Sequence, residues 1–103
     1  MMSNILNRFF TPSPDFKDLR KKGAIILDVR TLQEFSSGHI DGAVHIPLDL
    51  IGRNLAELKQ KNLPVIACCA SGMRSGAAKR ILTAAGIEAY NGGPWQTLDH
   101  KLK

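Results

Sequence analysis

A cysteine, a glycine and an arginine lie close together where an apolar run gives way to an amphipathic one. Residues 69–75 read CASGMRS and are preceded by the apolar run 64–68 and followed by residues 76–85. The first run predicts a buried strand, and the small and apolar residues of the second recur with helical spacing. We therefore expect Cys69 to lie in the strand-to-helix connection, facing unpaired N–H groups at the positive end of the helix.

This placement favours a reactive thiolate. The thiolate is the nucleophilic form of cysteine, and the pKa falls from about 8.5 to roughly 3.5–7.5 beside a helix N-terminus or a cation. Gly72 allows the backbone to turn its amides inward, Arg74 adds positive charge, and Ser75 is expected to cap the helix through its hydroxyl. The segment predicts an anion site with a nucleophile at its floor. On this pattern alone, a buried structural cysteine before a glycine turn stays open as an alternative.

Three segments resemble the rhodanese family of sulfurtransferases. Cys69-x-x-Gly72-x-Arg74-Ser75 after an apolar strand is similar to that family's active-site loop. Residues 28–47, DVRTLQEFSSGHIDGAVHIP, resemble its other signature, and residues 90–95, YNGGPW, resemble its glycine-glycine and tryptophan segment. Together they cover about residues 24–98 in the family's order, which makes the resemblance far more specific than a lone CxxG.

Two positions depart from the family pattern. Cys68 stands where an aromatic residue is usual, and Trp95 follows the glycines more closely than in many relatives. Neither lies in the loop that carries the thiol, so the departures bear on substrate preference more than on the reaction.

The resemblance implies a fold, an activity and a set of site residues. The fold is α/β and rhodanese-like, with a five-stranded parallel sheet flanked by helices on both faces. The activity is transfer of sulfane sulfur from thiosulfate or a persulfide to a thiophilic acceptor, through a persulfide on Cys69. The residues implied to bind the substrate are Ala70, Ser71, Gly72, Met73, Arg74 and Ser75, and those implied to support the site are Asp28, Arg30 and Trp95.

The remaining sequence predicts the elements that position this loop. Alternating strands and helices predict a parallel sheet with both faces covered. Asp28 is expected to be buried near the loop, with Arg30 pairing with Glu34. A helical turn is expected from Glu34, and Gly23 and Gly86 are expected to end helices. We expect strands at 8–11, 24–27, 44–46, 64–68 and 87–90, and helices from Ser13 and Pro14 onward, at 49–61, at 76–85 and at 95–102.

Length and composition exclude several classes of function. The chain has 103 residues, 44% of them hydrophobic, with a net charge of +5. We expect one domain over residues 1–103, with 1–8 loosely ordered. The positive charge favours anionic small molecules, in agreement with the anionic sulfur donor that the resemblance implies, but scattered Lys and Arg and few aromatic residues argue against nucleic acid. No run has transmembrane length, so no membrane partner is expected.

Metal and cofactor motifs are missing from the sequence. It has no GxGxxG, GxxxxGK[ST] or HExxH pattern, and His39, His45 and His100 lack metal-ligand spacing. We therefore expect neither a metal nor an organic cofactor. A disulfide between two adjacent cysteines closes a strained ring and cannot stabilise a fold. The pair therefore indicates reduced thiols in a reducing, cytoplasmic location.

Two other functions remain open beside sulfur transfer. Phosphatase or arsenate reductase loops of this fold place five residues between Cys and Arg, whereas this loop places four, which should suit sulfur better than a tetrahedral oxyanion. A protein-binding or thiol redox-sensing module is the second, although Cys68 is expected to point into the core, away from Cys69. His39 is not needed as a general base by a thiolate that is already ionised. Expected acceptors are cyanide, a thiol or a partner protein.

Overall fold

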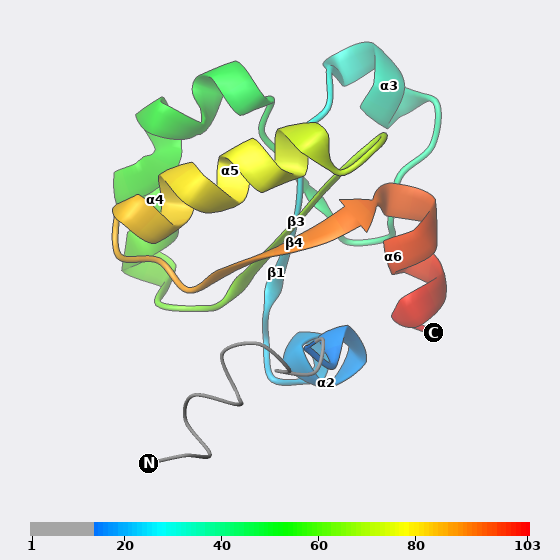
Figure 1. Ribbon diagram of the computed structural model, residues 1–103, viewed down its shortest axis with the longest axis horizontal. Coiled ribbons are helices and arrows are strands. Elements are labelled where there is room, and N and C mark those ends of the chain that lie inside the picture. The colour runs from blue at the N-terminus through cyan, green and yellow to red at the C-terminus, as the bar shows by residue number, and fades with distance from the viewer. Residues whose placement is uncertain (1–13) are drawn as a thin grey trace, which may run out of the picture.

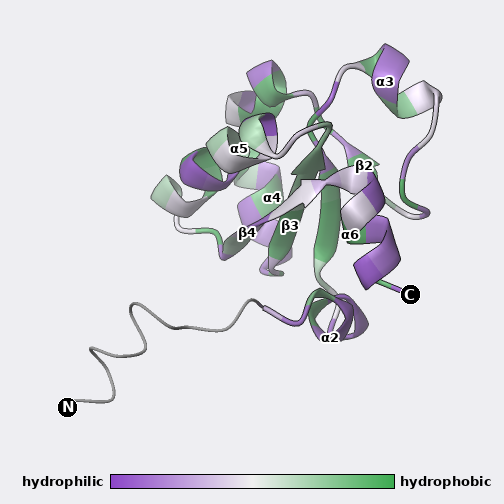
Figure 2. Ribbon diagram, turned by 45° about the vertical axis from the view of Figure 1, so that its right-hand side comes forward, coloured by the Kyte–Doolittle hydropathy of each residue, from purple (hydrophilic) through white to green (hydrophobic). Residues whose placement is uncertain are grey.

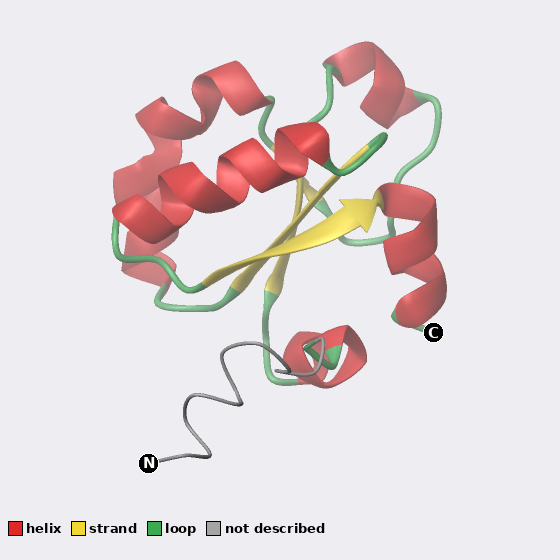
Figure 3. Cartoon of the chain, viewed as in Figure 1, coloured by secondary structure: helices red, strands yellow, loops and turns green. Residues whose placement is uncertain are grey.

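Four parallel strands form the centre of the computed structural model, which describes residues 14–103 (Figures 1 and 3). The strands lie in the order β2-β1-β3-β4. The predicted α/β class with a parallel sheet is confirmed, but the described residues hold four strands instead of five, and the expected strand at 8–11 lies outside them. The strands are β1 (Ile25–Asp28), β2 (Val44–His45), β3 (Val65–Cys69) and β4 (Ala89–Pro94).

Helices cover both faces of the sheet, as expected. Helices α2 (Phe16–Lys21) and α6 (Trp95–Lys101) pack on one face. The 3₁₀ helix η1 (Leu48–Asn54), α4 (Leu55–Lys61) and α5 (Met73–Ala84) pack on the other. Helix α3 (Leu32–Ser36) follows β1 near the carboxyl edge of the sheet (Figure 1). None of the helices within residues 14–103 combines the length and the apolar character needed to span a bilayer.

Strand β3 separates two hydrophobic cores. All five of its residues are buried, and Figure 2 shows β1 and β3 as strongly hydrophobic. Because neighbouring side chains of a strand point to opposite faces, Cys69 belongs to the core under α5 whereas Cys68 belongs to the core under α2 and α6. The expectation that Cys68 points away from Cys69 is confirmed.

Several helices begin or divide differently from the prediction. Helix α2 begins at Phe16 with Asp15 as its N-cap, whose carboxylate accepts from the Asp18 amide at 3.0 Å. The predicted cap Ser13 lies outside the described residues. Helix α5 begins three residues early because Gly72, at φ 96°, turns the chain directly into it. The predicted helix at 49–61 divides into η1 and α4, while Gly23 and Gly86 do follow helix ends at positive φ.

A β-bulge interrupts the pairing of β4 with β3. Ala67 pairs with Asn91, but the next residue of β3 pairs with Gly93, so Gly92 is the extra residue. A Cβ at Gly92 would lie 2.8 Å from Leu98 Cδ2 and 3.0 Å from the Ala67 carbonyl oxygen. Only glycine fits there without displacing its neighbours. The bulge lies beside the carboxyl end of β3, where Cys69 is found.

Candidate active site

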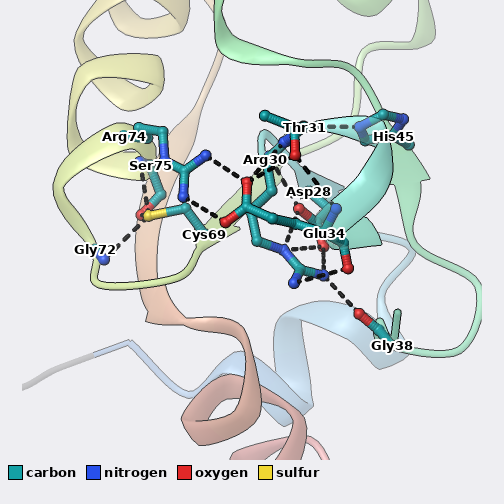
Figure 4. A network of polar contacts seen from close by, with 10 residues as sticks. All are labelled: Asp28, Arg30, Thr31, Glu34, Gly38, His45, Cys69, Gly72, Arg74 and Ser75. Atoms are coloured by element: carbon teal, nitrogen blue, oxygen red, sulfur yellow. Dashed lines mark hydrogen bonds and ion pairs between the residues drawn. The ribbon is translucent and has the colours of Figure 1, made fainter. Parts of the chain in front are cut away.

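Cys69 is the last residue of β3, and a short turn follows it. Its Sγ accepts hydrogen bonds from the Gly72 amide at 3.0 Å and from the Ser75 amide at 3.3 Å (Figure 4). Gly72 is the N-cap of α5 in the left-handed region, which glycine adopts without strain. The turn and the first turn of α5 thus bring two backbone N–H groups to one sulfur atom.

These contacts favour the charged form of the thiol. Burial raises the pKa of Cys69, but hydrogen bonds from the Ser75 side chain and from the amides of Ser75, Gly72 and Ser71 outweigh it. The pKa therefore lies below its ordinary value. The twelve-residue α5 begins beside the sulfur, and a helix N-terminus typically stabilises an anion by about 0.3–1 kcal/mol.

The sulfur has no open path to solvent in this conformation. Cys69 is 0% exposed, whereas Ala70 and Ser71 are exposed and Met73 is 80% exposed. The exposed residues of the turn thus lie around a thiol that is itself covered. In this conformation the surrounding residues cover the thiol of Cys69 completely.

The prediction that Ser75 caps the helix is wrong. Gly72 is the N-cap of α5, and no side chain caps this helix. Ser75 is fully buried, with its Oγ 3.3 Å from Cys69 Sγ. Its hydroxyl donates to Asn91 Oδ1 at 2.7 Å. Sequence reasoning missed Asn91 in the site, and its position just before the glycine pair of β4 was the one signal available.

Arg74 joins the start of α5 to α3. Its guanidinium donates to both carboxylate oxygens of Glu34, at 2.7 and 2.9 Å (Figure 4). Glu34 also closes a capping box with Thr31 at the start of α3. The Arg74 guanidinium holds the pKa of Glu34 well below its usual range. The predicted pairing of Arg30 with the Glu34 carboxylate is wrong, since Arg74 occupies it. Arg30 instead donates to the backbone carbonyl of Glu34 at 3.3 Å.

The three supporting residues form a cluster of their own. The Arg30 guanidinium donates to Asp28 Oδ2 at 2.6 Å and to the Gly38 carbonyl at 2.7 Å. Its Cζ lies 4.9 Å from the centre of the Trp95 ring. Asp28 is fully buried and Arg30 is 4% exposed. The cluster links β1, the segment after α3 and the start of α6.

His39 takes part in packing. Its Nδ1 lies 2.7 Å from the Phe35 carbonyl oxygen, and its ring stacks on Phe35 at 3.7 Å. A carbonyl accepts hydrogen bonds only, so Nδ1 carries the proton. The ring therefore packs against Phe35 of α3 and hydrogen-bonds its carbonyl.

Two open surface pockets each have one partner of the Arg74–Glu34 ion pair in their lining, and Arg30 lines both. One of about 450 Å³ is lined by Glu34, Gln33 and Trp95 among others. The other, of about 280 Å³, is lined by Arg74, Pro47 and Leu48 among others.

The sequence pattern of the rhodanese-like domain matches residues 13–93. The chain belongs to the rhodanese-like domain family. Among the curated relatives of this rhodanese-like chain is the thiosulfate sulfurtransferase GlpE of Pseudomonas savastanoi, 32% identical over 76 residues, which are 74% of this chain and 71% of GlpE. Another is the thiosulfate sulfurtransferase PspE of Escherichia coli, 36% identical over 61 residues, which are 58% of this chain and 59% of PspE.

A solved structure agrees with this membership. The rhodanese-like domain protein from Staphylococcus aureus superposes with a TM-score of 0.66 at 31% identity, covering 96% of this chain and 84% of that protein. Other relatives of the rhodanese-like chain are longer. It spans about half the length of several curated relatives and 34% of another.

Proposed function

We propose that this rhodanese-like chain is a sulfurtransferase that carries sulfane sulfur on Cys69. The observation that supports this most is the position of Cys69 Sγ, which receives the Gly72 and Ser75 amides at the N-terminus of α5. Such an arrangement stabilises a thiolate, the form that attacks sulfur. The names of GlpE and PspE support thiosulfate as donor.

The first half of the reaction loads the enzyme. The Cys69 thiolate attacks the outer sulfur of thiosulfate and forms a new S–S bond. The bond between the two thiosulfate sulfurs breaks, and its electron pair leaves with sulfite. The negative charge of the enzyme then lies on the outer sulfur of the persulfide, Cys69–S–S⁻, and neither a proton nor an external oxidant is needed.

The second half unloads the enzyme. Cyanide, a small thiolate or a thiolate of a partner protein attacks the outer sulfur, and the electron pair of the breaking S–S bond returns to Cys69 as thiolate. A group that alternates between two substrates in this way gives ping-pong kinetics. A low-molecular persulfide loads Cys69 by the same displacement, with a thiolate leaving in place of sulfite.

The turn after Cys69 has two tasks in this cycle. It must open for the donor, since Cys69 is 0% exposed, and it must then surround the outer sulfur. Ala70, Ser71 and Met73 offer small or neutral side chains with their backbone amides, and Gly72 gives the turn its freedom. Arg74 contributes positive charge beside the site while remaining attached to Glu34.

The experiment compares Cys69→Ala with the matched variant Cys68→Ala. We expect Cys69→Ala to abolish thiosulfate:cyanide transfer and the mass gain of one sulfur atom after incubation with thiosulfate. Cys68→Ala should retain both, because Cys68 lies in the opposite core. Transfer that survives in Cys69→Ala would defeat the proposal, and phosphate ester hydrolysis that depends on Cys69 would favour a phosphatase instead.

A further inference from the structure

Asn91 makes three hydrogen bonds beside the turn that follows Cys69. Its Oδ1 accepts from the Ser75 hydroxyl at 2.7 Å and from the Gly93 amide at 2.9 Å, while its Nδ2 donates to the Gly72 carbonyl at 3.0 Å. A backbone amide only donates and a backbone carbonyl only accepts. The orientation of the Asn91 amide therefore follows from its backbone partners alone, and Oδ1 is the atom that faces Ser75.

This orientation determines where the single proton of the Ser75 hydroxyl lies. Oδ1 has no proton to give, so the hydroxyl donates to Asn91 and has none left for Cys69 Sγ at 3.3 Å. In the neutral thiol, the S–H group of Cys69 donates to the Ser75 oxygen, which completes a chain of three residues. Once the thiol ionises it has nothing to donate, and the thiolate becomes a competitor for the hydroxyl proton.

We propose that Asn91 is a positioning residue that holds the Ser75 hydroxyl proton whenever Cys69 Sγ is uncharged and yields it whenever Sγ is a thiolate. Asn91 can yield the proton at little cost because Oδ1 keeps the Gly93 amide as a donor. The bulge at Gly92 makes this possible, since it offsets the ladder and lets the Asn91 side chain reach the Gly93 amide.

In sulfur transfer, which rests on the proposed function, the hydroxyl would turn twice in each cycle. Loading moves the charge from Sγ to the outer sulfur, so the hydroxyl returns to Asn91. Unloading restores the thiolate, and the hydroxyl turns back to Sγ as the electron pair arrives. Asn91 also fixes Gly72 from its carbonyl side while the Gly72 amide donates to Sγ.

A double-mutant cycle separates these two effects of Asn91. The midpoint of thiolate absorbance against pH is measured in the wild type, Asn91→Ala, Ser75→Ala and the double variant, with Cys69→Ala as the blank. In the Ser75→Ala background, Asn91→Ala can act only through Gly72 and the loop. With Ser75 present, Asn91→Ala also frees the hydroxyl for the thiolate. The change in midpoint caused by Asn91→Ala should therefore be more negative in the wild type than in Ser75→Ala, by about half a pH unit.

Equal shifts in both backgrounds would overturn the proposal, since Asn91 would then act on the loop alone. A second measurement needs no variant at the site. In amide spectra of the wild-type protein, the Asn91 side-chain resonances should titrate together with Cys69 and return to their low-pH positions after loading with thiosulfate. Resonances that do not respond to Cys69 ionisation would also overturn it. A chain that shows the coupling but takes no sulfur would contradict only the proposed function.

Discussion

Arg74 and Glu34 join the first turn of α5 to the first turn of α3 through two parallel N–H···O bonds of 2.7 and 2.9 Å. The two side chains are about a third exposed, at 35% and 34%. A carboxylate therefore sits against Arg74, the cation of the loop that follows Cys69, and offsets part of its charge. An anionic donor at this site therefore meets the positive charge of Arg74 together with the negative charge of Glu34.

Replacing Glu34 by glutamine changes the balance of these two charges. Gln retains the capping interaction with Thr31, since either residue type serves in a capping box, but it no longer neutralises Arg74. We expect Glu34→Gln to lower the KM for thiosulfate, more so at low salt than at high salt. Steady-state kinetics at two ionic strengths measure this effect.

Asp18→Asn is the matched control for that variant. It removes one negative charge from an exposed pair on α2, away from α3 and α5. The KM for thiosulfate should then stay unchanged. Identical changes in the two variants would mean that overall charge, and not the local pair, governs donor binding.

Cys68 makes the stability of the fold sensitive to alkali. Burial raises the pKa of Cys68 to about 12 in the folded chain. An unfolded thiol loses its proton near pH 8.5, so the unfolded state gains stability as pH rises from about 8.5 toward 12, at up to ~1.4 kcal/mol per pH unit. Between about pH 8 and 10, below the pKa of the folded thiol, the free energy of unfolding should fall less in Cys68→Ala than in the wild type. Urea unfolding measures this difference. Parallel loss in both proteins would contradict the assignment.

The buried Asp28–Arg30 pair should be sensitive to loss of one partner. Arg30→Leu leaves the carboxylate of Asp28 buried and without its cation, which typically costs about 3–5 kcal/mol. Denaturant unfolding measures the loss. Lys22→Leu, at an exposed pair with Asp18, is the control and should change stability little. A mild effect of Arg30→Leu would mean that the buried ion pair contributes little to the stability of the fold.

Two glycines give opposite expectations for the same substitution. Gly92→Ala places a Cβ 2.8 Å from Leu98 Cδ2 and should destabilise by about 1–3 kcal/mol. Gly52→Ala in η1 meets nothing within 4 Å and should be neutral or stabilising by up to ~1 kcal/mol. Thermal unfolding of the two variants side by side measures the difference. Similar melting temperatures would show that β4 yields easily at the bulge.

The strand, turn and helix around Cys69 could be predicted because each leaves a local pattern. The apolar run, the glycine and the helical spacing are all short-range signals. The partners of the charged residues leave no such signal. Arg30 lies four residues before Glu34 and two after Asp28, and the choice between the two carboxylates depends on Arg74, which lies 40 residues from Glu34 in the sequence and binds it.

The contacts of Ser75 and Asn91 depend on tertiary register. Ser75 was predicted to cap a helix that in fact begins at Met73, so its hydroxyl lies inside the first turn and faces the sulfur. Asn91 reaches it because β4 carries a bulge whose position depends on the packing of Gly92 against Leu98. Neither the register nor the bulge has a periodic signature in the sequence.

The opposite orientation of Cys68 and Cys69 on β3 has a consequence for damage by peroxides. A thiolate oxidised to sulfenic acid is commonly rescued by a second thiol, which condenses with it to a disulfide. Cys68 faces the other core and cannot reach Cys69 without disrupting the central strand. Because residues 1–103 hold no third cysteine, recovery of an oxidised Cys69 depends on a thiol from another molecule, and peroxide inactivation should reverse only when a reductant is added.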